Sequence, residues 1–281
     1  MRVVESEDTH FYIDNAPPDE VAMVLRCLSP SEPLTADAIA ERLASDYGLE
    51  MQRDKTYSPR RLFDLGLAVP VAAPRLEYTL SSLGAKLRAV SALDQDMFWE
   101  LMHFLHYSLY YRQHNARKYL WSYHRCCDVS WEEGRLPPRE EMAAKVQALM
   151  REEFSSLDFS ARLGARFDST AVGRWLSWIK QLSPCPFPKG QDVLQKRGVQ
   201  RYELLLLSLD CVYHTRGYRY GDPVVLDDKL LDDVARVFFL DAVCCRQLVD
   251  LAARMSKSIV LRDTFAGTSL NLLAPYGLEN V

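Results

Sequence analysis

Residues 52–61 bring together basic side chains that could contact a phosphate backbone. They read QRDKTYSPRR, in which four cations accompany one carboxylate, that of Asp54. Lysine and arginine bind phosphate oxygens, and this charge balance suits such contacts. We therefore expect a nucleic-acid-binding stretch whose contact residues are Arg53, Lys55, Tyr57, Ser58, Arg60 and Arg61, with Arg75 in the next predicted turn. The alternative is an ordinary solvated face of the same composition.

A second group of side chains with chemical potential lies between Leu101 and Cys127, where the chain has no acidic residue. This span is rich in aromatic residues and holds four of the six histidines. Three interpretations stand side by side: a long buried helix that joins two domains, a surface whose rings stack on unpaired bases, and a zinc site. The zinc ligands would be His103, His106 and His124 with Cys126 or Cys127, although no second pair has the spacing of a zinc site.

The cations of the same span need partners, because an isolated charge is costly to bury. With no carboxylate nearby in the sequence, the partner is either a distant part of the fold or a bound polyanion. We expect Arg112, Arg117 and Lys118 to form one positive surface patch beside the N-terminal domain.

Catalytic patterns are scarce. Glycine-rich phosphate loops, the His-Glu-x-x-His helix and the Gly-x-Ser-x-Gly elbow are all absent from the sequence. The nearest pattern is Asp227-x-Lys229, which is similar to the Asp-x-Lys of metal-dependent nucleases and would need Asp210 or Asp222 as a second metal ligand. Asp227 also stands where a helix cap belongs, and we favour that role. We expect no enzyme activity, metal or cofactor.

Composition indicates a globular protein of about two domains. The chain has 281 residues, 48% of them apolar and 26% charged, with a net charge of −4. Any nucleic-acid binding must therefore depend on local patches. The seven cysteines include two adjacent pairs and no Cys-x-x-Cys, which favours free thiols. An acidic N-terminus and the lack of a long apolar run predict a cytoplasmic protein with no membrane contact.

Hydrophobic spacing predicts the elements of the first ninety residues. Val21, Val24, Leu25 and Leu28 fall on one face of a helix, Thr35 can cap a second helix that Gly48 ends, and a third lies within 53–65. Two short strands, 67–72 and 76–80, flank a turn, and a fourth helix begins at Ser81 or Ser82. We expect Tyr78, Leu80 and Leu83 to be core residues at this junction.

Three helices, a hairpin and a closing helix resemble a winged-helix domain, and the Tyr-x-Leu-Ser-x-x-Gly-x-x-Leu run from Tyr78 to Leu87 is similar to that family's wing-to-helix junction. The resemblance implies that the third helix enters the major groove of DNA. Winged helices also serve as protein-interaction modules. The whole chain loosely resembles uncharacterised bacterial proteins encoded in anti-phage defence islands, which implies work within a multiprotein assembly.

The rest of the chain is predicted to be helical. Residues 128–138 should form a loop. Helices are expected over 141–154, 168–182 and 202–213, and the segment 159–166 could pair with the helix over 168–182. Helices over about 227–238 and 241–255 and β-runs at 258–262 and 269–273 repeat the wing arrangement. We thus expect a mainly α protein with a winged-helix domain (1–92), a helical connection (93–157) and a C-terminal, mainly helical domain (158–281) carrying a small hairpin. The expected function is non-catalytic binding of double-stranded DNA, with protein partners or a homodimer; the alternatives are an interaction scaffold and a nuclease.

Overall fold

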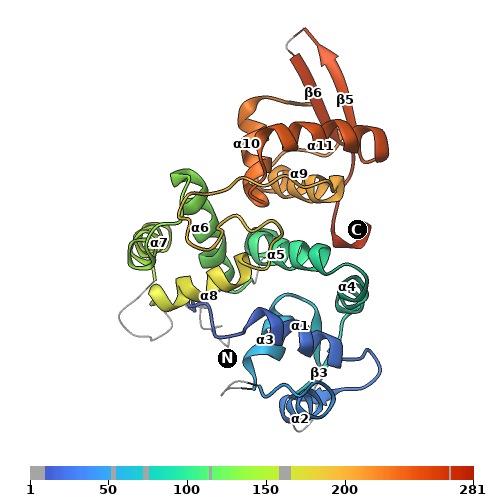
Figure 1. The fold of residues 1–281 in the computed structure, drawn as a ribbon. Helices are drawn as coiled ribbons and strands as arrows, with labels where there is room; N and C mark the ends of the chain where they lie inside the picture. Colours follow the sequence, from blue (N-terminus) through green and yellow to red (C-terminus); the bar gives the residue numbers. More distant parts are fainter. Residues whose placement is uncertain (1–9, 52–54, 72–75, 114–115, 158–165, 266) are drawn as a thin grey trace, which may run out of the picture.

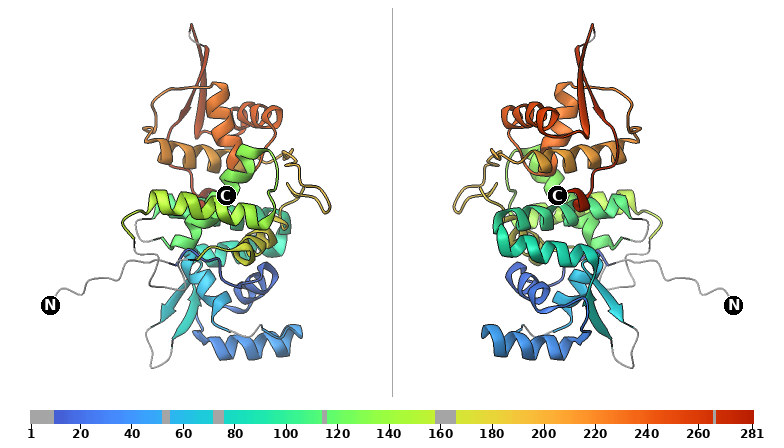
Figure 2. Two further views of the ribbon diagram at one scale, coloured as in Figure 1. Left: turned by 90° about the vertical axis from the view of Figure 1, so that its left-hand side faces the viewer. Right: turned by 90° about the vertical axis from the view of Figure 1, so that its right-hand side faces the viewer.

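The computed structural model describes residues 10–51, 55–71, 76–113, 116–157, 166–265 and 267–281, and these are mainly helical, as predicted. Two small three-stranded antiparallel sheets lie at opposite ends of the molecule, with helices between them (Figures 1 and 2). The chain thus divides into three parts: an N-terminal unit (18–93), a middle region (95–179) and a C-terminal unit (202–272). Within the described residues, none of the helices has both the length and the apolar character that a membrane crossing requires.

The N-terminal unit contains the four predicted helices and the predicted hairpin. Its elements in chain order are α1 (Pro18–Cys27), β1 (Leu34–Thr35), α2 (Ala36–Tyr47), α3 (Tyr57–Asp64), β2 (Ala68–Val71), β3 (Glu77–Leu80) and α4 (Ser82–Leu93). The strand order in the sheet is β1-β3-β2, and Leu34 pairs with Tyr78. The short strand β1 adds an edge to the hairpin that the sequence did not predict.

Local chemistry explains where these elements begin and end. The Thr35 hydroxyl accepts a hydrogen bond from the backbone N–H of Ala38, and Gly48 ends α2 with φ of 64°. Ser81 caps α4 by accepting from Gly84 N at 2.9 Å. At Gly84 the helix lies so close to the sheet that a Cβ would be 1.9 Å from the Leu67 carbonyl oxygen, so this position requires glycine.

The described residues of the middle region form four helices, α5 (Gln95–Arg112), α6 (Lys118–Glu133), α7 (Arg139–Glu153) and α8 (Ser169–Ile179), and the predicted partner segment 159–166 lies almost wholly outside them. Asp94 is both the C-cap of α4 and the N-cap of α5, so α5 follows α4 with no linker. Every residue of α5 from Met97 to Leu109 is buried. The predicted loop over 128–138 is wrong in its first half, because α6 continues to Glu133, buries Val129 and Trp131, and ends at Gly134.

The C-terminal unit repeats the order of the N-terminal one. It contains α9 (Tyr202–Arg216), β4 (Val224–Val225), α10 (Asp228–Val237), α11 (Ala242–Met255), β5 (Ile259–Thr264) and β6 (Gly267–Leu272), before a short 3-10 helix, η2 (Leu278–Asn280). Its strand order is β4-β6-β5, which matches β1-β3-β2 position by position. The β5–β6 hairpin projects beyond the helices of its unit (Figures 1 and 2).

A buried ion pair joins the connection that precedes α9 to the middle region. Arg197 and Glu100 are 1% and 3% exposed, and the guanidinium contacts both carboxylate oxygens. Its remaining N–H groups donate to the carbonyl oxygens of Pro184, Ser183 and Phe238. All five donors of the side chain are therefore satisfied, which is the condition under which a buried charge is tolerated.

Candidate nucleic-acid interface

The predicted basic stretch is divided by the fold of α3. Arg60 is exposed, as is Lys55, whose ammonium lies 3.4 Å from the Asp37 carboxylate. Tyr57 is half-buried. Arg53 and Arg75 lie outside the described residues. Within the described part of the stretch, Arg60 and Lys55 are thus the cations that reach solvent.

Ser58 and Arg61 are buried and do not present their polar groups to a ligand. The Ser58 hydroxyl donates to the Glu20 carboxylate inside the unit. Arg61, 3% exposed, lies with its guanidinium carbon 3.9 Å from the centre of the Tyr119 ring in α6. This face of α3 is used for docking on the middle region, which the sequence could not reveal because Tyr119 is distant in the chain.

A second contact fixes the same face. Arg117 Nε donates to the Asp64 carboxylate at 3.2 Å. Burial raises the pKa of Asp64, although Arg117 and Arg61 oppose the shift. The side chains of α3 therefore divide into a docked face, with Arg61 and Asp64, and an exposed face, with Arg60 and Phe63.

The predicted patch of Arg112, Arg117 and Lys118 needs correction. Arg112 pairs at 2.9 Å with Asp210, whose side chain is 1% exposed, and Arg117 pairs with Asp64. The Lys118 ammonium lies 4.2 Å from the centre of the Phe154 ring. Both arginines thus find carboxylates in distant parts of the fold, which was the alternative to a bound polyanion.

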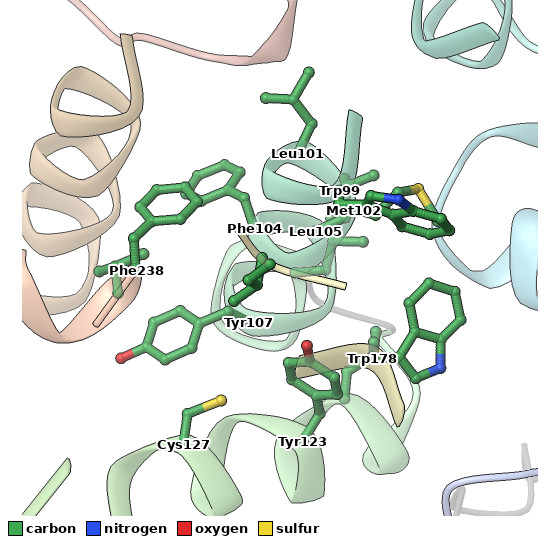
Figure 3. Packing of buried hydrophobic residues seen from close by; sticks show 14 of the residues in the cluster. Trp99, Leu101, Met102, Phe104, Leu105, Tyr107, Tyr123, Cys127, Trp178 and Phe238 are labelled. Carbon is green, nitrogen blue, oxygen red and sulfur yellow. The ribbon is translucent and has the colours of Figure 1, made fainter. Parts of the chain in front are cut away.

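The aromatic span is mostly buried, as the first interpretation predicts, but it forms two helices, α5 and α6, and not one long helix. Figure 3 shows Trp99, Phe104, Tyr107, Tyr123 and Trp178 packed together from different helices. All of these are at most 7% exposed, so they offer no platform for unpaired bases. The prediction that most rings of this span are buried is confirmed.

The histidines of α5 are structural. His103 Nε2 donates to the Val237 carbonyl oxygen at 2.8 Å, and Nδ1 accepts from the Tyr123 hydroxyl at 2.9 Å. Burial lowers the pKa of His103 to about 3 and holds that of His106 well below its usual value. Among the described residues, no three His, Cys, Asp or Glu side chains are grouped so as to hold a metal, so the proposed zinc set is not assembled.

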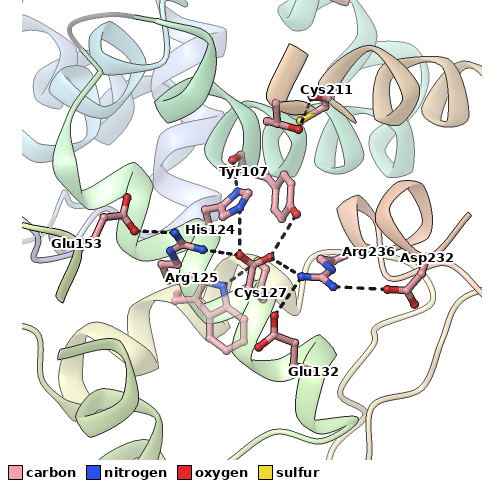
Figure 4. A network of polar contacts seen from close by, with 12 residues as sticks. Tyr107, His124, Arg125, Cys127, Glu132, Glu153, Cys211, Asp232 and Arg236 are labelled. Carbon is pink, nitrogen blue, oxygen red and sulfur yellow. Dashed lines mark hydrogen bonds and ion pairs between the residues drawn. The ribbon is translucent and has the colours of Figure 1, made fainter. Parts of the chain in front are cut away.

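His124 belongs to a polar network with Arg125 and Arg236 (Figure 4), and their shared partner is Asp128. Its two ring nitrogens lie 2.9 Å from the Tyr107 carbonyl oxygen and 3.2 Å from the Asp128 carboxylate. Arg125 of the same helix and Arg236 of α10 also approach Asp128. Burial raises the pKa of this carboxyl, but His124 and the two arginines outweigh burial and hold it below its usual value. The network joins the middle region to the C-terminal unit.

Two carboxylates of the nuclease pattern make contacts within the fold. Asp227 caps α10 by accepting from Leu230 N at 2.8 Å, as favoured from the sequence. Asp210 is engaged by Arg112, by the Tyr220 hydroxyl and by the backbone N–H of Tyr276. Its oxygens are therefore committed to holding α9 in place.

An exposed group of cations that the sequence reading missed lies on the C-terminal unit. Arg254, in the last turn of α11, Lys257, in the connection, and Arg262, on β5, are all exposed. Among the described residues, none of the three forms an ion pair with a carboxylate. The available clue was the position of these residues on the helix and strand that correspond to α3 and β2, whereas the local sequence is not densely basic.

Comparison with known proteins adds no relative. No protein-family model matches the chain, and neither a curated protein nor a solved structure is significantly similar to it.

Proposed function

We propose that the protein is a non-catalytic, double-stranded-DNA-binding protein whose two end units are winged helices. In this proposal α11 and the β5–β6 hairpin are the recognition helix and wing of the C-terminal unit, and α3 and the β2–β3 hairpin are their N-terminal counterparts. The observation that carries the proposal is the shared order of elements in the two units, together with the identical strand order of their sheets.

Charge favours the C-terminal unit as the main contact. Arg254, Lys257 and Arg262 are exposed cations without carboxylate partners among the described residues, and they follow one another from the helix into the wing. Phosphate contacts dominate the affinity of DNA-binding proteins, and an ion-paired side chain must first give up its partner. Arg60 supplies a smaller contribution from the N-terminal unit.

The test is a duplex-binding measurement at two salt concentrations with the full-length protein. Replacing Arg254, Lys257 and Arg262 with alanine should weaken binding and reduce the salt slope by about one unit per lost contact. A control with the same net charge replaces the exposed Arg151, Lys180 and Lys189 instead, and it should behave like the wild type. Absence of duplex binding by the wild type, or an unchanged slope in the first variant, would refute the proposal.

A second candidate, protein docking, is favoured by one feature of the N-terminal unit. Its α2 carries exposed Asp37, Glu41 and Asp46, and the apolar side chains Tyr47, Phe63 and Leu76 are 47%, 39% and 59% exposed. Exposed carboxylates disfavour DNA, and together with exposed apolar side chains they favour a basic protein partner. Cross-linking that maps to Tyr47 and Phe63, and is lost in the Phe63→Asp variant, would support this role.

A further inference from the structure

We infer that Phe265 is a wedge that enters the minor groove of a DNA duplex and separates a base step. This inference depends on the proposed DNA binding and adds a property to it: the bound duplex is bent and locally unstacked. Phe265 lies between β5 and β6, at the end of the projecting hairpin, and its side chain is fully exposed.

The hairpin turn does not itself require a phenylalanine. Thr264 pairs with Gly267, so the loop between the strands has two residues. Such loops favour Asn, Asp and Gly for their backbone geometry, and a large ring adds nothing to it. No other part of the described unit covers the ring, so its apolar surface is available to a ligand.

Three exposed cations on the elements that lead to the ring favour a polyanion as the ligand. Arg262 is exposed on the strand that leads to the tip, and Lys257 and Arg254 are exposed at the start of that strand and at the end of α11. Proteins that bend DNA combine cations on the phosphates with an apolar side chain inserted between base pairs, which kinks the duplex by about 20–90°. The exposed cations and the bare aromatic ring supply this combination, and the carboxylate between them, that of Asp263, accepts a hydrogen bond from the Thr268 hydroxyl.

The length of the hairpin favours insertion by the C-terminal unit. Its strands have six residues each. At about 3.4 Å per residue, each strand spans roughly 20 Å. This length exceeds the depth of the minor groove, which is about 7.5 Å.

The experiment uses the full-length protein and mixed-sequence duplexes with 2-aminopurine at a flexible TA or CA step and a dye pair at the two ends. Binding of the wild type should raise the 2-aminopurine fluorescence, as the base unstacks, and the energy transfer, as the duplex bends. Phe265→Ala should lower the affinity about tenfold, since the buried ring is lost, and should abolish both optical changes. Phe265→Leu, which keeps an apolar wedge, should retain much of each change.

Val225→Ala is the matched control, because Val225 is 51% exposed on β4 of the same sheet but does not lie on the hairpin. It should behave like the wild type. Duplex binding by the wild type without unstacking, or unstacking that persists in Phe265→Ala, would overturn the wedge and leave the proposed DNA binding standing. Failure of the wild type to bind any duplex would refute both.

Discussion

The N-terminal unit packs α3 against the middle region, whereas the C-terminal unit packs α9 and α10 there and leaves one face of α11 exposed. Arg61 and Asp64 of α3 contact Tyr119 and Arg117, both at the start of α6. In the C-terminal unit the corresponding contacts come from the end of α10, through Arg236 and the Val237 carbonyl oxygen.

Two units with one order of elements can thus present different helices to solvent. The same element, the helix before the hairpin, is a docking element at one end and a free surface at the other. The order of elements alone therefore does not identify the binding face; the contacts with the rest of the molecule decide it.

The largest expected effect is on the buried contact of Arg197, which links the connection before α9 to Glu100 of α5 and to the Phe238 carbonyl oxygen of the C-terminal unit. Glu100→Ala leaves Arg197 buried without its carboxylate and should lower the free energy of unfolding by about 3–5 kcal/mol. Glu132, whose side chain is 62% exposed beside Arg236, is the control, and its replacement by alanine should cost under about 0.5 kcal/mol. Urea denaturation would measure the free energy of unfolding of both variants. Equally small losses in the two would show that the Arg197–Glu100 pair contributes little to stability.

Inside the N-terminal unit, the contact of α4 with the sheet should be nearly as sensitive. Gly84→Ala puts a methyl group against the Leu67 carbonyl oxygen and should cost about 3 kcal/mol. Gly198→Ala is the matched control, because nothing lies within 4 Å of the added Cβ and its backbone is not left-handed. Thermal unfolding that is the same for both variants would contradict the close approach.

The docking of α3 can be separated from any role in DNA binding by two adjacent residues. Arg61→Ala removes a buried guanidinium from the Tyr119 ring and should cost about 2 kcal/mol of stability. Arg60→Ala should cost under about 0.5 kcal/mol and should lower the salt slope of duplex binding by about one unit. If Arg61→Ala instead reduced the salt slope at unchanged stability, Arg61 would lie on the exposed face of α3 and not on its docked face.

Acid should weaken the α10 contact through His103. An unfolded histidine has a pKa of about 6.5, whereas burial lowers the pKa of His103 to about 3. The unfolded chain therefore binds the proton more readily than the folded chain. The stability that the neutral His103 contributes is fully present above a pH of about 6.5 and is lost as the pH falls toward 3. His103 alone should remove about 1.4 kcal/mol per pH unit in that range, and His103→Gln should make the dependence shallower by this amount. Denaturation at several pH values would detect an unchanged slope, which would contradict a buried neutral imidazole.

The smallest effect concerns a core residue predicted from the sequence. Tyr78 and Leu80 are buried as expected, but Leu83 is half-buried, and Leu87 is the fully buried leucine of the junction. Leu83→Ala should cost about 1 kcal/mol, compared with about 2–5 kcal/mol for Leu87→Ala. Similar losses of unfolding free energy for the two variants in chemical denaturation would show that Leu83 is as buried as Leu87.

Periodicity and capping were sufficient to predict most elements, because those depend on neighbouring residues. Thr35, Ser81, Asp168 and Asp227 all cap the helices that the sequence predicts, and the hairpins lie where alternation places them. The end of α6 was missed because a helix that is buried on several sides shows no simple apolar stripe.

The candidate interface was harder to predict, because exposure depends on contacts between distant segments. Composition suggested that residues 52–61 are free to bind phosphate. In the structure, however, Ser58 donates a hydrogen bond to Glu20 and Arg61 packs on the Tyr119 ring. Composition likewise made Arg112 and Arg117 look unpaired, although Asp210 and Asp64 neutralise them. Arg254, Lys257 and Arg262 were overlooked because they are spread over a helix, a connection and a strand, and no dense basic run marks them in the sequence.

The junction at Asp94 makes the chain intolerant of changes in length at that point. Asp94 ends α4, accepts a hydrogen bond from Met97 N at the start of α5, and pairs with Arg201 near the C-terminal unit. A residue inserted into a helix rotates the two flanking parts of the chain relative to each other by about 100° and separates them by about 1.5 Å. With no loop to absorb such a step, an insertion or deletion here would turn the whole N-terminal unit away from its contacts on α6, whereas the two-residue loop of the β5–β6 hairpin could be lengthened with no effect on docking.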